Sequence, residues 1–190
     1  MGNLTLFMHV SLDGFGSGIN GQMDWIHVDD EIFDYGAERI YATDTALYGR
    51  KTYQLMESYW PTVVKSPTGN KATDEFAVAI DNIPKVVFSR TLKHIEWNTA
   101  RLATRDIQEE VSALRQEAGK DIFVGSRSLI VTLLNLNLID EFQLLVQPII
   151  ATKGLPLFEN INDRIDLRLV KTRTLAGTGS IINYYEPAKR

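Results

Sequence analysis

The chain has 190 residues, of which 44% are hydrophobic and 23% charged, a composition typical of a soluble globular protein with a substantial core. Its formal net charge of −4 argues against nucleic acid or an anionic membrane as the main partner. The absence of cysteine excludes disulfides, thiolate metal sites and a cysteine nucleophile, and it fits a reducing cytoplasm. Residues 1–10 lack the basic start of a signal peptide, and no segment approaches the roughly 18 apolar residues that span a bilayer. We therefore expect a cytoplasmic protein without a membrane partner.

Strands and helices are predicted to alternate along the chain. Residues 4–10 form an apolar run typical of a buried strand, and the four glycines of residues 11–21 predict a mobile loop rather than an element. Asp29 or Asp30 can cap the first helix. Further helices are expected over residues 50–58, 74–80, 128–135 and, after an Asp106–Glu109 capping box, up to Gly119. Further strands are expected over residues 45–48, 85–89, 121–125, 142–150, 166–174 and 180–185.

This order of elements predicts an α/β fold. Strands separated by helices favour a mostly parallel central sheet with right-handed crossovers, flanked by helices. The last two strands, joined through the glycine-containing residues 176–179, predict an antiparallel hairpin at the edge of that sheet. No break in composition and no linker divides the chain, so we expect one domain over residues 1–190.

The segment Gly49-Arg50-Lys51-Thr52 is the strongest local indication of a site. It lies where an apolar strand runs into a helix, and helix N-termini offer free N–H groups and a positive dipole end to phosphate. Two adjacent cations favour the 2′-phosphate of NADPH over NADH. The alternative is a solvated basic pair at an ordinary helix start.

Two further strand ends repeat this pattern. Ser89 and Arg90 follow one strand, and Gly125, Ser126 and Arg127 follow another. Because parallel strands deliver their carboxyl ends to one edge of a sheet, these segments are expected to lie near the first one. A strand leaving the sheet into solvent and a tight strand-to-helix turn are the respective alternatives.

Acidic and aromatic side chains provide the remaining possibilities. Asp13 and Asp30 are expected as polar or acid/base groups at the pocket, against the alternatives of an Asp-Gly turn and a helix cap. Trp25 and Tyr53 can stack on a heterocyclic substrate or can belong to the core. The three histidines show no ligand spacing, so no metal is expected.

Taken together, several short segments in order along nearly the whole chain resemble the dihydrofolate reductase-like superfamily. The resemblance is to the branch shared with the C-terminal reductase domain of bacterial riboflavin biosynthesis. The matching segments are Ser11-Leu12-Asp13-Gly14, Asn20-Gly21-Gln22-Met23-Asp24-Trp25, Gly49-Arg50-Lys51-Thr52-Tyr53, Tyr59-Trp60-Pro61, Val86-Val87-Phe88-Ser89-Arg90, Ile122-Phe123-Val124-Gly125-Ser126, Leu138-Ile139-Asp140-Glu141 and Gln147-Pro148-Ile149-Ile150, followed by Gly154, Leu157-Phe158 and the final hairpin.

The resemblance implies a three-layer fold and an NADPH-dependent reductase that transfers a hydride to a small nitrogen heterocycle, either pterin-like or a ribosylamino-pyrimidine. By position, it implies cofactor contacts from Ile19, Asn20, Gly49, Arg50, Lys51, Thr52, Ser89, Arg90, Gly125, Ser126 and Arg127. It places Asp30 where folate reductases carry their acidic substrate-binding residue. Alternatives are the 5-amino-6-(5-phosphoribosylamino)uracil reductase of riboflavin biosynthesis and a non-catalytic nucleotide-binding module. The resemblance also implies a homodimer.

Overall fold

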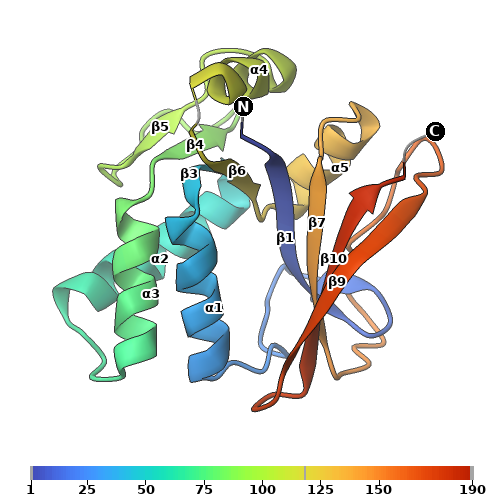
Figure 1. Cartoon of the computed structure of the whole chain (residues 1–190). Coiled ribbons are helices and arrows are strands. Elements are labelled where there is room, and N and C mark those ends of the chain that lie inside the picture. Colours follow the sequence, from blue (N-terminus) through green and yellow to red (C-terminus); the bar gives the residue numbers. More distant parts are fainter. Residues whose placement is uncertain (1, 118, 189–190) are drawn as a thin grey trace.

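The computed structural model describes residues 2–117 and 119–188, and in these residues ten strands and five helices are present (Figure 1). The strands are β1 (Leu4–Ser11), β2 (Phe15–Ser17), β3 (Thr43–Gly49), β4 (Lys85–Phe88), β5 (Ala100–Leu102), β6 (Asp121–Val124), β7 (Glu141–Gln147), β8 (Leu155–Pro156), β9 (Leu167–Leu175) and β10 (Ser180–Pro187). The helices are α1 (Asp30–Tyr41), α2 (Arg50–Lys65), α3 (Lys71–Asn82), α4 (Ile107–Glu117) and α5 (Arg127–Asn135).

Eight strands form one mixed sheet in the order β5-β4-β3-β6-β1-β7-β10-β9. The first six are parallel to one another, and β10 and β9 complete the sheet as an antiparallel hairpin. The predicted mostly parallel sheet with a C-terminal hairpin is therefore confirmed. Because β4, β3, β6 and β1 are neighbours, their carboxyl ends meet at one edge of the sheet.

Helices cover both faces of this sheet, as the alternation of side chains along the strands requires. Leu4 and Leu6 of β1 pack on one face against α4 and α5, in a core cluster that includes Val111 and Ile130. On the other face, Tyr48 of β3 joins a second cluster with residues of α1 and α3. Figure 1 shows α1 and α3 side by side on that face. The result is a three-layer α/β fold.

Side-chain caps mark the starts of three helices. The carboxylate of Asp29, rather than that of Asp30, accepts the Ile32 N–H at the start of α1. Asn70 caps α3 through the Thr73 N–H, and Asp106 accepts the Glu109 N–H at the start of α4. The predicted cap at Asp106 is thus present. Asx side chains in these positions satisfy N–H groups that have no partner within the helix.

Several elements differ from the prediction. β2 lies inside the segment predicted to be a mobile loop, where it pairs with β8, and β5 completes the far edge of the sheet. These strands have two or three residues, too few for a periodic pattern. Helix α2 continues through Pro61 to Lys65, because Val63 beyond the proline is buried in the core. None of the described helices is long and apolar enough to cross a membrane.

Candidate functional site

A cleft of about 1260 Å³ lies at the carboxyl ends of β1, β3, β4 and β6 and extends beneath α1. This volume exceeds the roughly 300–1,000 Å³ of ordinary small-molecule sites, so the cleft has room for a dinucleotide and a second ligand. The predicted site residues that line it are Gly49, Arg50, Lys51, Thr52, Ser89, Arg90, Gly125, Ser126 and Arg127.

Two helices begin at the wall of the cleft without a side-chain cap. α2 follows the N-cap Gly49, α5 follows the N-cap Ser126, and neither of these residues makes a side-chain cap hydrogen bond. The N–H groups of their first turns therefore remain available, with the positive end of each helix dipole behind them. Such helix starts suit an anionic ligand, above all a phosphate.

The Ser126 hydroxyl joins the two helix starts instead of capping its own helix. Its Oγ accepts the Gly49 N–H at 3.1 Å and lies 3.1 Å from the Thr52 hydroxyl. Gly49 permits this approach, because a Cβ there would lie 2.8 Å from Ser126 Oγ. The starts of α2 and α5 are thereby held at a fixed distance from each other.

The neighbouring Gly125 has a packing role of its own. A Cβ at this position would lie 3.0 Å from the Phe123 ring and 3.3 Å from the Phe7 carbonyl oxygen. A larger residue would therefore press on the cleft wall itself, so Gly125→Val would not test phosphate contact separately from packing.

Positive charge gathers along the cleft although the whole chain is negative. The cations on its wall are Arg39, Arg50, Lys51, Arg90, Arg105 and Arg127, with Asp106 as the carboxylate among the lining residues. Of these, Arg127 is already paired with Glu159 and donates to the Pro156 carbonyl. Arg39 is paired with Asp121, whereas Arg50, Lys51, Arg90 and Arg105 are exposed. Of these four, Arg50, Lys51 and Arg90 adjoin the carboxyl ends of β3 and β4.

Ser89 organises the turn after β4. Its hydroxyl oxygen accepts the Leu92 N–H at 2.9 Å and the Thr91 N–H at 3.2 Å. The Ser89 O–H is left to donate. Ser89 and Arg90, predicted as neighbouring site residues, both lie on the cleft wall.

The other half of the cleft, here called the inner half, is mainly apolar. Aromatic rings supplied by β1, β6 and the helices line it, together with aliphatic side chains: Phe7, Ile32, Phe33, Trp60, Phe76 and Phe123. Trp60 stands edge-on to both Phe33 and Phe76, at centroid distances of 6.1 and 4.7 Å. Walls of this kind suit a flat aromatic ligand.

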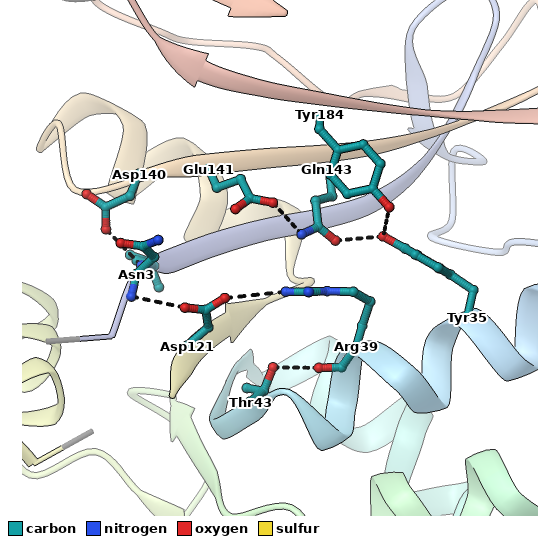
Figure 2. Close-up of polar contacts among 10 residues, drawn as sticks. Asn3, Tyr35, Arg39, Thr43, Asp121, Asp140, Glu141, Gln143 and Tyr184 are labelled. Atoms are coloured by element: carbon teal, nitrogen blue, oxygen red, sulfur yellow. Dashed lines mark hydrogen bonds and ion pairs between the residues drawn. The ribbon is translucent and has the colours of Figure 1, made fainter. Parts of the chain in front are cut away.

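Helix α1, which forms one wall of the inner half, is fastened to the sheet by a buried hydrogen-bond chain. The Tyr184 hydroxyl donates to the Tyr35 hydroxyl at 2.9 Å, and Tyr35 donates to Gln143 Oε1 at 2.8 Å (Figure 2). At the far end of the helix, Arg39 pairs with Asp121 at 3.5 Å. These contacts set the width of the cleft beneath the helix.

Asp13 does not line the cleft. Its carboxylate accepts hydrogen bonds from the Ser11 hydroxyl and from the backbone N–H groups of Ala151 and Thr152. The Ser11 bond, followed by the backbone bonds, lowers the pKa of Asp13 below its ordinary value, so the group stays ionised. The Asp13 carboxylate thus ties the loop after β1 to the segment after β7. This position corrects the expectation that Asp13 is an acid/base group of the pocket.

The remaining predicted residues also lie away from the cleft wall. Asp30 is exposed and accepts a hydrogen bond from Asn70 at 2.8 Å. Tyr53 is 2% exposed and accepts the N–H groups of Glu96 and Trp97, so it is a core residue and not a stacking platform. The cleft wall does not include Trp25, Ile19 or Asn20; the last two are exposed.

The predicted mobile loop is anchored over its first part. Leu12 N–H donates to the Ile149 carbonyl, Leu157 N–H donates to the Gly14 carbonyl, and β2 pairs with β8. Residues 18–28 contain no helix or strand, and Gly21, Met23, Ile26 and Val28 from this segment line the cleft. The His27 N–H donates to Gln147 Oε1 on β7, so the part of the loop without an anchor to the sheet is residues 18–25.

Among the polar residues of the cleft wall, His9, Arg39 and Arg105 were not singled out from the sequence. For His9 a signal existed, because it alternates with the buried Leu4, Leu6 and Met8 and so faces the opposite side of β1. Arg39 and Arg105 had no local signal. Within the described ranges, no group of three or more His, Asp or Glu residues is placed to hold a metal ion.

Comparison with known proteins gives matches over nearly the whole chain. The family model of the RibD C-terminal domain matches residues 3–179. The uncharacterized protein YyaP of Bacillus subtilis (strain 168) is 39% identical over 175 residues, which cover 91% of this chain and 89% of that protein.

Solved structures share the fold at lower identity. A Shewanella sp. PV-4 protein, provisionally named for riboflavin biosynthesis, aligns with a TM-score of 0.74 at 20% identity and covers 98% of this chain and 99% of its own. Dihydrofolate reductase from Enterococcus faecalis, solved with NADP(H), aligns with a TM-score of 0.64 at 15% identity and covers 98% of this chain and 97% of its own. The fold is therefore dihydrofolate reductase-like.

Proposed function

Because the chain belongs to the RibD C-terminal domain family, we propose that it is an NADPH-dependent reductase that transfers a hydride to a small nitrogen heterocycle. The observation that carries this proposal is the pair of uncapped helix starts at the ends of the adjacent strands β3 and β6. They are linked through Ser126 and bordered by exposed cations. This arrangement offers two neighbouring sites for the phosphates of one dinucleotide.

The residues present fit the cofactor. The α2 start with Thr52 suits one phosphate, and the α5 start after Gly125 suits the pyrophosphate. Arg50, Lys51 and Arg90 form a cationic group for the additional 2′-phosphate of NADPH. When bound, NADPH supplies the hydride and thus the redox chemistry. The dihydrofolate reductase that shares the fold was solved with NADP(H), which supports this choice of cofactor.

The protein's own part is to position the reactants and exclude water. The apolar inner half holds a flat heterocycle against the cofactor half, so that the two reacting carbons meet in a fixed orientation. Residues 18–25 close over this junction and keep water from it. His9 is the ionisable group on the wall of β1, and it contributes a hydrogen bond rather than charge.

The aromatic and aliphatic walls of the inner half support a pterin-like ring or a ribosylamino-pyrimidine as the substrate. The riboflavin step, reduction of 5-amino-6-(5-phosphoribosylamino)uracil, is supported by the family match and by the name of the Shewanella sp. PV-4 protein. The alternative of a non-catalytic nucleotide-binding module predicts a filled pocket beside the cofactor. The volume of about 1260 Å³ favours the reductase over that module.

The test is titration of the purified protein with NADPH and with NADH, followed by quenching of tryptophan fluorescence. We expect NADPH to bind at least tenfold more tightly, because a charge-assisted hydrogen bond contributes about 1.5–3 kcal/mol. Arg90→Ala should reduce NADPH affinity and leave NADH affinity unchanged. Arg164→Ala, a change at an exposed arginine paired with Asp166, is the matched control. Equal affinity for the two cofactors would contradict the proposal.

A further inference from the structure

His9 on the wall of the inner half has one ring nitrogen that is engaged and one that is free. It lies on β1 beside Phe7, with the two rings edge-on at 5.7 Å. Gln147, fully buried on the neighbouring strand β7, places its Nε2 3.1 Å from His9 Nδ1. In the described part of the chain, His9 Nε2 has no hydrogen-bond partner. Because His9 lines the cleft, Nε2 is the nitrogen that a ligand can reach.

Gln147 determines which ring nitrogen of His9 carries the proton. The backbone N–H of His27 donates to Gln147 Oε1 at 3.2 Å, and a backbone N–H can only donate. The side-chain NH₂ group of Gln147, and not its carbonyl oxygen, therefore faces His9 and donates to His9 Nδ1. Nδ1 accepts, so the proton of the neutral ring is on Nε2. Burial lowers the pKa of His9 to about 4, which keeps the ring neutral near pH 7.

Arg39, the cation that α1 brings to the cleft wall, is already paired with Asp121. The adjoining wall comes from the segment that the His27–Gln147 bond holds in place, with Ile26 and Val28, and from α1, with Ile32 and Phe33. The cations Arg50, Lys51 and Arg90 stand instead at the ends of β3 and β4, two strands or more away across β6. The wall beside His9 is thus mainly apolar, and the His9 ring supplies an uncharged donor on β1.

We propose that His9, held by Gln147 as the Nε2–H tautomer, determines substrate specificity by selecting an uncharged planar ring that presents a carbonyl oxygen or ring nitrogen. This inference rests on the proposed function, because the inner half is left for the substrate only if the dinucleotide occupies the cationic half. His9 donates to the acceptor atom, while Phe33 and Trp60 contact the faces and edges of the ring. Gln147 is a positioning residue that acts through His9.

The experiment uses two bicyclic probes of nearly the same shape. Quinoline has a ring nitrogen that accepts a hydrogen bond and is uncharged at pH 7.5, whereas naphthalene has no acceptor. Their affinities for the protein are measured by ligand-observed NMR in the presence of saturating NADPH. We expect quinoline to bind more tightly than naphthalene, and His9→Leu to remove about tenfold of quinoline affinity without changing that of naphthalene.

Two variants separate the hydrogen bond from the packing. His9→Gln keeps an N–H donor near the same place and should retain part of the preference for quinoline. Gln147→Glu replaces the amide donor by a carboxylate acceptor, which draws the proton of His9 to Nδ1 and should weaken quinoline binding. His94→Leu, a change at an exposed histidine away from the cleft, is the matched control.

A measurement on the unaltered protein makes the test independent of variant folding. Imidazole ¹⁵N spectra distinguish the two tautomers, and His9 should show a protonated Nε2 whose resonance shifts when quinoline is added. A protonated Nδ1, or a preference for quinoline that survives in His9→Leu, would overturn the proposal. Failure of NADPH to bind, with the quinoline preference intact, would instead count against the proposed function and not against His9.

Discussion

The Gly49 N–H donates to the Ser126 hydroxyl at 3.1 Å, and this bond connects two helix starts that lie 77 residues apart in the chain. Both residues are buried, and the Thr52 hydroxyl joins them at 3.1 Å. A phosphate site that spans two strand ends requires that their spacing stays constant. The Ser126 hydroxyl provides this link at the point where β3 and β6 leave the sheet.

Ser126→Ala should therefore weaken cofactor binding and stability together. The variant leaves the buried Gly49 N–H without a partner, which costs about 1–3 kcal/mol in the free energy of unfolding. NADPH affinity should fall about fivefold to tenfold, because the two helix starts lose their common spacing. Urea unfolding and fluorescence titration measure the two effects. Ser112→Ala, at an exposed serine of α4, should change neither value, and an unchanged NADPH affinity in Ser126→Ala would refute the link.

Two buried tyrosines should respond differently to loss of the hydroxyl. Tyr35→Phe leaves the Tyr184 hydroxyl and Gln143 Oε1 without their partner (Figure 2), so the free energy of unfolding should fall by about 1–3 kcal/mol. The buried Tyr48 hydroxyl has no hydrogen-bond partner among the described residues. Tyr48→Phe should accordingly leave stability unchanged or raise it. Equal losses for the two variants would show that Tyr48 does have a partner.

Stability should depend on pH through His9. Burial lowers its pKa from 6.5 to about 4, so above pH 6.5 the ring is neutral in both folded and unfolded chains and contributes no pH dependence. Between about pH 6.5 and 4 the unfolded chain binds a proton that the folded chain does not. As the pH is lowered through this range, the free energy of unfolding falls by up to about 1.4 kcal/mol per pH unit. The free energy of unfolding is measured over this pH range for the unaltered protein and for His9→Gln. The difference between the two curves removes the contribution of the carboxylates, which titrate in both proteins. A difference that is constant with pH would contradict it.

Residues 18–25 should behave as the part of the loop that closes. The amides of Leu12, Gly14 and Phe15 donate to the Ile149 carbonyl, the Ser11 carbonyl and the Ser11 hydroxyl, and they should exchange slowly with deuterium with or without cofactor. Amides of residues 18–25 should exchange quickly in the free protein and more slowly with saturating NADPH. Hydrogen-exchange mass spectrometry resolves the two segments, and identical protection of residues 18–25 in both states would argue against a lid.

The chain is expected to form a homodimer through the hairpin edge of the sheet. β9 is the last strand in the order of the sheet, and Leu169, Val170 and Ile181 are 51%, 46% and 42% exposed on the hairpin. Pairing across a two-fold axis would cover these side chains. Light scattering should give twice 21.5 kDa, and Ile181→Glu should lower the mass toward 21.5 kDa. Val78→Glu, at a residue 43% exposed on α3, is the control, and a mass of 21.5 kDa for the unaltered protein at micromolar concentration would exclude a stable dimer.

The sequence by itself was sufficient wherever a pattern is local. Apolar periodicity and Asx caps predicted the longer elements, and a small residue followed by hydroxyls and cations marked the two helix starts at Gly49 and Gly125. These signals are readable because the backbone conformation of a few consecutive residues produces them. The parallel order of the strands then brought the two segments to one edge of the sheet.

Only the tertiary structure decided which polar side chains reach the cleft. Asp13 and Tyr53 looked available in the sequence, but their partners Thr152 and Trp97 lie 139 and 44 residues away and hold them elsewhere. His9 looked unremarkable, yet Gln147, 138 residues later, gives it a defined tautomer. A side chain's hydrogen bonds depend on which strands become neighbours. That adjacency comes from packing of the whole sheet, and short strands such as β2 and β8 exist only because their distant partner is present.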